Sequence, residues 1–430
     1  MYTHRRRSSI SFLQASWICA GAVLSVMFAI AAFSGFWPWT RNPYPSYILQ
    51  ADAWLHGRLD LGRDYEWLEL AIYEGKYYVS FPPFPSYILL PFVAIMGQSA
   101  PDTLIAWYVT LVGVLTAFRM CRNLGLSPAI CIFWTLFLYL GTGYLFVAQT
   151  SWVWFFAQTL AFTLSLLSLN CALENKGGWS LGFWACSVGC RPLDALYLPL
   201  LFLLLRHHER DRSIPSWIRR HLTWAIAPCL IALSYMLLNY FRFGNPLEFG
   251  HNYLPEFVRA PLGQFSLSYV ADHLKMLVHL PSVDSSRGNL IFSHVETNAF
   301  FLICPLSVSF LIALTQGICR TIRHALKHDR NDRETNPHKD RRDHPTEDLL
   351  LLILIPLLLL AHVFLLCMHR TLGGFQFGNR YFVDLMPFLL LGILIFKQPD
   401  ERQDLYHLPL MVFGACVNIL GTVQTYALWG

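Results

Sequence analysis

A carboxylate that could act as a general base lies in residues 38–84, the first polar segment between two apolar runs. Leu49, Ala53 and His56 recur at the spacing of one helical face, so this part of the segment predicts a short helix lying along a membrane interface. Asp52 is expected to point away from the lipid. We therefore expect its carboxylate just above the bilayer, where it could take a proton from a hydroxyl group.

Other groups suited to a sugar phosphate occur in three segments that lie between apolar runs. Amides bridge sugar hydroxyls, aromatic rings stack on sugar faces, and guanidinium groups hold phosphate through paired donors. We predict donor-phosphate or substrate binding by Arg58, Lys76, Arg380, Tyr381, Gln376, Asn379, His56, Asp60, Arg242, Asn245, Glu248 and His251. The chemistry expected of this set is transfer of a sugar from a phosphate leaving group.

Some of these residues also have a purely structural interpretation. Asp52 can cap or solvate an interfacial helix, and Arg58 and Lys76 can extend to lipid headgroups. His56 and His251 stand singly, and no histidines or cysteines have the spacing of metal ligands, so no metal site is predicted.

Charged residues within apolar runs are expected to form ion pairs with each other. Arg191 and Asp194 lie three residues apart, and we expect them to pair with each other or to face a polar cavity. Arg380 and Asp384 lie four apart at the start of a helix and allow the same interpretation. Because Arg380 also borders an outward-facing segment, it remains a candidate for the donor phosphate.

The elements that must position these groups are membrane helices. The chain has 430 residues, of which 55% are hydrophobic and 14% charged. Apolar runs long enough to cross a bilayer recur throughout, and backbone groups within lipid must be satisfied internally. We therefore predict one transmembrane domain over residues 1–430, an all-α integral membrane bundle of about 10–12 helices with short interfacial helices in the first outer loop.

The positive charge of the chain, formally +5, is explained by topology rather than by nucleic acid, because the basic residues form short blocks between apolar runs. Arg5 to Arg7 place the N-terminus in the cytoplasm, before an uncleaved first helix at 12–37. The chain is then expected to be a multi-pass protein of the inner (plasma) membrane. The eleven cysteines lie in or beside apolar segments and indicate neither a disulfide framework nor a zinc cluster.

Basic blocks fix the orientation of the second half. Residues 206–220, 320–342 and 397–402 belong inside, with helices expected at 221–240, 298–316, 348–367, 381–396 and 407–428. Residues 241–297, a second large extracytoplasmic loop, and 368–380 then face outward beside 38–84. The stretch 317–348 mixes basic and acidic residues with few apolar ones, which predicts a charged flexible cytoplasmic loop.

Two arrangements fit the chain between 85 and 205. In one, residues 86–96 only dip into the membrane and 178–205 form a hairpin of two short helices, which keeps Arg119, Arg122 and Lys176 inside. In the other, both segments span the membrane and those three charges lie outside. Charge favours the first arrangement, and the outer loops face the same side in both.

The chain resembles integral-membrane glycosyltransferases of the GT-C fold class, which include protein O-mannosyltransferases and lipid A aminoarabinose transferases. More narrowly, it resembles a bacterial mannosyltransferase-like group. The segments that carry this resemblance are Ala51 to Leu61, Gly75 to Tyr78 with Pro82 and Pro83, Cys190 to Pro192, Arg242 to Tyr253, and Gln376 to Pro387.

The resemblance implies a polyprenyl-phosphate sugar donor, an extracytoplasmic acceptor and inverting transfer, with the catalytic acid carried over onto Asp52. The resembled proteins commonly have an Asp-Glu pair at that point, whereas here Asp52 is followed by Ala53 and the next acid is Asp60. We therefore expect no cofactor; a divalent metal is compatible with the class but unsupported by this sequence.

Two other functions fit a bundle of this kind. Arg191 and Asp194 could mark the path of a polytopic transporter, although no matched pair of interrupted helices stands out in the two halves. The chain could also be a non-catalytic component of polysaccharide assembly that shares the fold.

Overall fold

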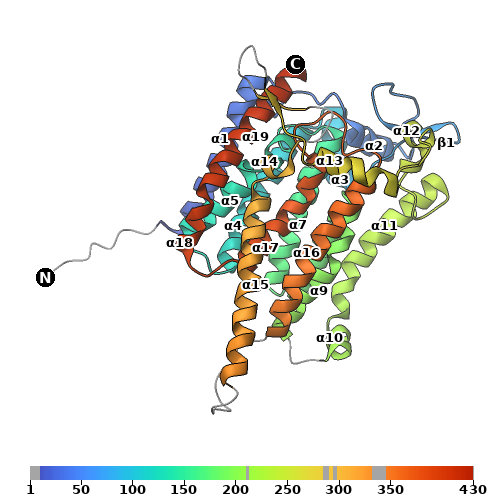
Figure 1. Ribbon diagram of the computed structural model, residues 1–430. Helices are drawn as coiled ribbons and strands as arrows, with labels where there is room; N and C mark the ends of the chain where they lie inside the picture. Colours follow the sequence, from blue (N-terminus) through green and yellow to red (C-terminus); the bar gives the residue numbers. More distant parts are fainter. Residues whose placement is uncertain (1–9, 210–212, 284–289, 294–297, 332–344, 430) are drawn as a thin grey trace.

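A bundle of roughly parallel helices makes up most of the computed structural model (Figure 1). The structure describes residues 10–209, 213–283, 290–293, 298–331 and 345–429. Within these ranges, six helices are long and apolar enough to cross a membrane. The predicted all-helical membrane fold is thus confirmed, whereas the predicted role of Arg5 to Arg7 lies outside the described residues.

The helices that run along the bundle alternate in direction (Figure 1). They are α1 (Phe12–Ser34), α4 (Asp102–Asn123), α5 (Pro128–Leu140), α7 (Val153–Leu173), α8 (Gly177–Val188), α9 (Leu198–Arg206), α11 (Ile226–Phe243), α15 (Leu306–Asn331), α16 (Pro345–Met368), α17 (Met386–Phe396) and α19 (Leu408–Trp429). The other described helices lie between them in the chain: α2 (Ser46–Leu55), α3 (Phe84–Met96), α6 (Tyr144–Val147), α10 (Ile214–Arg220), α12 (Pro255–Val258), α13 (Val270–Met276), α14 (Phe300–Ile303) and α18 (Glu401–Asp404).

Short 3₁₀ helices and two small hairpins complete the described elements. The 3₁₀ helices are η1 (Gly97–Ser99), η2 (Pro192–Tyr197), η3 (His207–Glu209), η4 (Leu222–Ala225), η5 (His251–Tyr253), η6 (Leu267–Tyr269), η7 (Arg380–Leu385) and η8 (Leu405–His407). The antiparallel hairpins are β1 (Leu70–Tyr73) with β2 (Lys76–Val79), and β3 (Ser282–Val283) with β4 (Leu290–Ile291).

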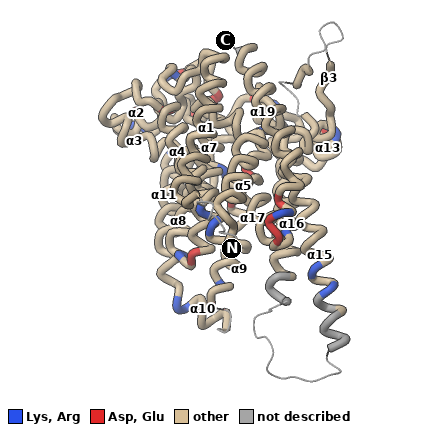
Figure 2. The backbone as a smooth tube through the Cα atoms, turned by 90° about the vertical axis from the view of Figure 1, so that its left-hand side faces the viewer, with Lys and Arg blue, Asp and Glu red and all other residues tan. Residues whose placement is uncertain are grey.

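The bundle has two chemically different ends. One end, which we call the loop end, carries α2, β1 and α12, and the opposite end, which we call the basic end, carries α10 (Figure 1). Lysines and arginines lie on α10 and on the far part of α15 (Figure 2). The described residues of the polar segments 38–84, 241–297 and 368–380 thus meet at the loop end, on one side of the bundle, as their predicted topology requires.

Helix α3 begins and ends at the loop end. Near its start, the Phe84 amide donates to the carbonyl of Gly189 (3.0 Å). Just beyond its end, Gln98 donates to Asp52 (2.9 Å), and α2 packs along α3. A helix of this course does not cross the bundle, so the structure adopts the first of the two arrangements considered for residues 85–205.

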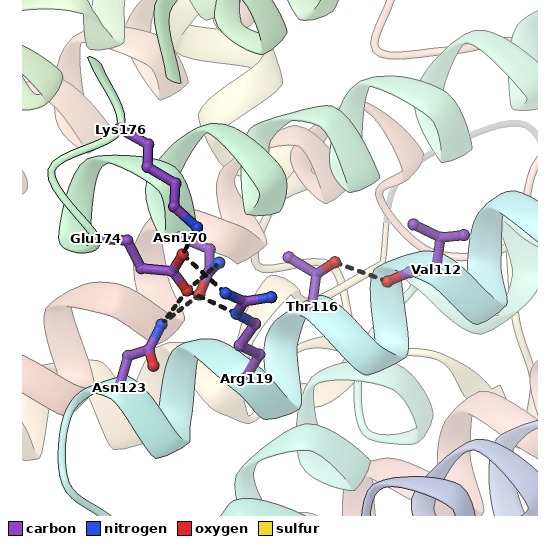
Figure 3. Close-up of polar contacts among 7 residues, drawn as sticks. All are labelled: Val112, Thr116, Arg119, Asn123, Asn170, Glu174 and Lys176. Carbon is purple, nitrogen blue, oxygen red and sulfur yellow. Dashed lines mark hydrogen bonds and ion pairs between the residues drawn. The ribbon is translucent and has the colours of Figure 1, made fainter. Parts of the chain in front are cut away.

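Arg119 and Lys176 lie at the basic end, as that arrangement requires. Both pair with Glu174 (Figure 3), and the neighbouring Ala172 carbonyl accepts a bond from His208 (3.2 Å), which belongs to the basic block. Gly177, at the start of α8, lies against Trp224 of η4, which directly precedes α11. The segment 178–205 forms α8 and α9 with η2 between them, which is the predicted hairpin of two short helices.

Two predicted boundaries in the second half need correction. The helix expected at 298–316 begins as the single turn α14, breaks at Cys304 and Pro305, and resumes as α15, because proline lacks the amide that would continue the ladder. Helix α15 then continues to Asn331, and α16 begins at Pro345. Much of the stretch predicted as a flexible loop over 317–348 is therefore helical, and residues 332–344 lie outside the described part.

The physical reason for the longer α15 is its apolar stripe. Ile318, Ile322 and Leu326 recur every fourth residue, which places them on one face of a helix. The rest of that helix surface is polar, because basic residues surround the apolar stripe. The mean composition of the stretch concealed this spacing. Such a face lets a helix continue past the apolar core of the membrane.

Candidate active site at the loop end

Arg380 is a buried cation without a counterion. Its side chain is 4% exposed, and its guanidinium carbon lies 4.5 Å from the ring centre of Tyr381 and 5.8 Å from that of Phe155. The Nε atom has no hydrogen-bond partner, and no described residue forms a salt bridge with this guanidinium. Because a buried, uncompensated charge is costly, the arrangement is suited to an anion bound from outside the chain.

The backbone around Arg380 is held by two amides. Gln376 Oε1 accepts from the Arg380 amide (3.1 Å), and Gln158 Nε2 donates to the Arg380 carbonyl (2.7 Å). Asn379 and Asn298 are joined by two bonds, from Nδ2 of Asn379 to the Asn298 carbonyl (2.7 Å) and from the Asn298 amide to Asn379 Oδ1 (3.0 Å). The predicted substrate amides Gln376 and Asn379 thus fix the backbone that presents Arg380.

Arg191 lies near the same tyrosine ring as Arg380. Its guanidinium carbon lies 5.0 Å from the centre of the Tyr381 ring, and its Nε donates to Asp384 Oδ2 (2.6 Å). Tyr381 therefore borders two guanidinium groups, one paired with a carboxylate and one not. This pairing differs from both pairs suggested by the sequence.

The local backbone explains the difference. Arg191 has extended φ and ψ angles and precedes η2, so helical spacing does not bring it onto Asp194. Asp194 instead accepts from Ser187 and Ser165. Arg380 opens a 3₁₀ turn, in which residues three apart and not four apart share a face, so the expected i, i+4 ion pair does not form, although Asp384 still acts on Arg380 electrostatically.

Glu69 is the acid of the first loop that lies within electrostatic reach of Arg380. It directly precedes β1, and its Oε2 accepts from Nε1 of Trp154 (2.9 Å). Its charge also acts on Tyr44 and Glu256. Glu69 is not among the residues predicted from the sequence, because only the folded hairpin distinguishes it from the other acids of this loop.

A hollow of about 290 Å³ opens beside Glu69, between the first and second loops. It is lined by Asp64, Glu66, Leu68, Glu69, Leu70, Ile72, Leu254, Pro255 and Glu256. Burial raises the pKa of Glu256, and Glu69 adds to this, while Arg370 acts in the opposite direction. A ligand entering this hollow would meet carboxylates and aliphatic side chains together.

Asp52, the acid selected from the sequence, has a different set of neighbours. It lies in α2 with its carboxylate partly exposed, accepts from Gln98 Nε2 (2.9 Å), and lies 3.6 Å from Nδ1 of the exposed His56. No described arginine bonds to it. Its role as a catalytic base stays a prediction.

The remaining predicted residues of the first loop lie near its surface. Arg58 and Lys76 are exposed, and neither forms an ion pair with any described residue. Asp60 accepts from the amide of Gly62 (2.8 Å) and so shapes a turn. These residues lie on the same end as Arg380 without contacting it.

The second loop is tied to the first by its predicted substrate residues. Arg242 is buried and donates to the Val79 carbonyl (3.2 Å) and to Asn239 Oδ1 (2.7 Å). His251 donates from Nδ1 to the Ser80 carbonyl (2.6 Å). Burial lowers the pKa of His251, so its ring is neutral near pH 7. Both side chains hold the β1–β2 hairpin against the second loop.

Turn formation accounts for the other two polar residues predicted in this loop. Asn245 Oδ1 accepts from the Leu247 amide (3.0 Å), and Glu248 accepts from the Gly250 amide (2.6 Å) and from Asn252 (2.7 Å). Their contacts are thus local. Within the described ranges, no group of three or more His, Cys, Asp or Glu side chains is arranged to hold a metal ion.

Comparisons with known proteins give likenesses of structure only. No protein-family model matches the chain, and a search of curated proteins finds no match. The solved structure of ArnT from Cupriavidus metallidurans, in the apo state, is similar over 95% of this chain and 76% of that one, with 13% identity and a TM-score of 0.49. The oligosaccharyltransferase of Archaeoglobus fulgidus, also in the apo form, is similar over 94% of this chain, with 11% identity and a TM-score of 0.43. The present chain spans 56% of that second protein.

Proposed function

We propose that this protein is a membrane glycosyltransferase that moves a sugar from a polyprenyl-phosphate donor to an acceptor at the loop end of the bundle. The observation that carries the proposal is the buried guanidinium of Arg380, which has no anionic partner of its own among the described residues. A lipid-linked phosphate would supply that charge.

The proposed reaction is a direct displacement at the anomeric carbon. The acceptor hydroxyl gives its proton to a carboxylate while its oxygen forms the new glycosidic bond. The bond between the anomeric carbon and the phosphate oxygen breaks, and its electron pair leaves with the polyprenyl phosphate. Arg380 stabilises that charge as it develops, and a single displacement inverts the anomeric configuration.

Two acids compete for the role of base. Asp52 is implied by the sequence resemblance, whereas Glu69 is supported by its electrostatic interaction with Arg380 and by the hollow beside it. An acceptor bound in that hollow would lie next to Glu69. The geometry therefore favours Glu69, with Asp52 as the alternative.

Vesicles containing the full chain, supplied with a panel of radiolabelled polyprenyl-phosphate sugars and envelope acceptors, test the proposal. We expect Glu69→Gln to lower transfer by about 10²-fold or more, since a general base contributes roughly 10²–10⁴-fold. Glu66→Gln, which removes another acid from the same hollow, serves as the matched control and should keep wild-type transfer. A loss in Asp52→Asn with full activity in Glu69→Gln would reassign the base to Asp52.

The product distinguishes transfer from transport. We expect labelled glycoside whose anomeric configuration, determined by NMR, is opposite to that of the donor. Label that crosses the bilayer without forming a glycosidic bond would contradict the proposal and favour a transporter, and retained configuration would contradict the single displacement.

A further inference from the structure

The basic end of the bundle contains a second hollow, at the opposite end from the candidate active site. Its volume is about 360 Å³, and it lies between the start of α1 and the end of α4. It is lined by Phe12, Leu13, Ser16, Leu115, Phe118, Arg119, Arg122 and Asn123. Both helices are candidate membrane spans, so their ends lie at the depth of lipid headgroups.

One cation at this hollow is held in place by a carboxylate. Arg119 donates from Nε (2.6 Å) and Nη2 (2.8 Å) to Glu174, which also pairs with Lys176 (2.6 Å) (Figure 3). Although burial acts to raise it, the bonds from Lys176, Arg119 and Asn123 lower the pKa of Glu174 to about 2. Glu174 therefore stays ionised and positions the Arg119 guanidinium at the edge of the hollow.

A second cation has no such partner. Arg122 is exposed and forms no salt bridge with any described residue, and its guanidinium carbon lies 5.3 Å from the ring centre of Phe12. Of the two arginines that line the hollow, Arg119 is paired with Glu174 and Arg122 is not, so the polar edge of the hollow is positive. Serine and asparagine side chains beside them, Ser16 and Asn123, add neutral hydrogen-bonding groups.

The other side of the hollow is apolar and continues onto the lipid-facing surface of α1. Leu13 is 69% exposed and Trp17 54% exposed, in a helix whose apolar window is only one-third buried. Phe12, Leu115 and Phe118 form the apolar wall next to the cations. A positive edge above an aliphatic and aromatic wall matches a charged headgroup joined to acyl chains.

We propose that this hollow, which we call the α1–α4 groove, binds an anionic phospholipid. Its phosphate would lie against Arg122 and the free Nη1 edge of Arg119, and its acyl chains along Leu13 and Leu115. Arg122 supplies the unpaired charge, and the Glu174 network prevents Arg119 from reorienting. The site is independent of the sugar-transfer proposal, because it lies at the opposite end of the bundle.

Native mass spectrometry of the full chain, titrated with dioleoyl phosphatidylglycerol or dioleoyl phosphatidylcholine, tests the groove. We expect the first phosphatidylglycerol to bind more tightly than phosphatidylcholine in the wild type. Arg122→Gln should weaken that first binding step roughly fivefold, the attraction expected of one basic side chain at an anionic surface. Arg219→Gln, which removes an equally exposed arginine from α10 at the same end, is the matched control and should leave binding unchanged.

Three outcomes would overturn the proposal. Equal affinity of the wild type for the two lipids would do so without recourse to any variant, as would equal weakening by Arg122→Gln and Arg219→Gln. The third is displacement of phosphatidylglycerol by millimolar inorganic phosphate, which would show that the groove recognises free phosphate rather than a lipid. Retention of the lipid in phosphate buffer supports the lipid as the occupant.

Discussion

At the scale of single residues, the loop end separates two arginines that look alike in sequence. Arg191 lies against Asp384, whereas Arg380, near the same tyrosine ring, forms no salt bridge with any described residue. Arg380 was predicted as a phosphate-binding residue from its position beside an outward-facing segment. The partner of Arg191 could not be predicted, because the contact between Arg191 and Asp384 joins residues 193 positions apart in the chain.

This difference predicts opposite effects on stability. Asp384→Asn leaves Arg191 without its carboxylate and should lower the free energy of unfolding by about 1.5–3 kcal/mol, the usual contribution of a hydrogen bond to a charged group. Arg380→Gln breaks no pair and should leave stability equal or higher. Thermal unfolding of the purified variants in one detergent measures both, and a larger loss in Arg380→Gln than in Asp384→Asn would contradict the interpretation of Arg380 as an unpaired cation.

At the scale of elements, the small β1–β2 hairpin places Glu69 within electrostatic reach of Arg380. Leu70 pairs with Val79 and Tyr73 with Lys76, and the two turn residues, Glu74 and Gly75, both have positive φ. This turn type fits the twist of a hairpin. The segment Gly75 to Tyr78 was noted in the sequence without prediction of the hairpin, and Glu69 was therefore missed.

The hairpin turn gives a prediction of its own. Gly75 has φ +72° and open space around its Cα, so Gly75→Val acts only through the backbone, at a cost of about 1–2 kcal/mol. We expect reduced sugar transfer with an almost unchanged melting temperature, because the hairpin strains while the bundle stays intact. Gly374→Val, at an equally open glycine with negative φ, should retain activity, and equal loss in both variants would argue against a role for the hairpin.

At the scale of the whole molecule, apolar runs and basic blocks predicted the course of the chain well. The helices alternate as expected, and the outer segments gather at one end (Figure 1). The spacing of Ile318, Ile322 and Leu326 explains the main error, the loop predicted over 317–348, because mean charge outweighed periodicity there. Convergence of the three polar segments could be predicted, whereas the contacts within them could not.

Sidedness is predicted by the positive-inside rule, which places the basic end in the cytoplasm. We expect Lys76→Cys to react with a membrane-impermeant maleimide added to intact cells, and Arg219→Cys to react only after permeabilisation, with the natural cysteines giving the background signal. Both positions are exposed. Labelling of Arg219→Cys alone in intact cells would invert the topology and place the candidate site on the cytoplasmic side.

The central claim is that Arg380 holds the phosphate of a lipid carrier, and direct binding of a polyprenyl phosphate to the purified full chain tests it most directly. We predict saturable binding by the wild type and about tenfold or greater weakening in Arg380→Gln, the effect of losing a charge-assisted bond to phosphate. Arg259→Gln, at an exposed arginine of the second loop, should bind as the wild type does. Unchanged affinity in Arg380→Gln would contradict the account.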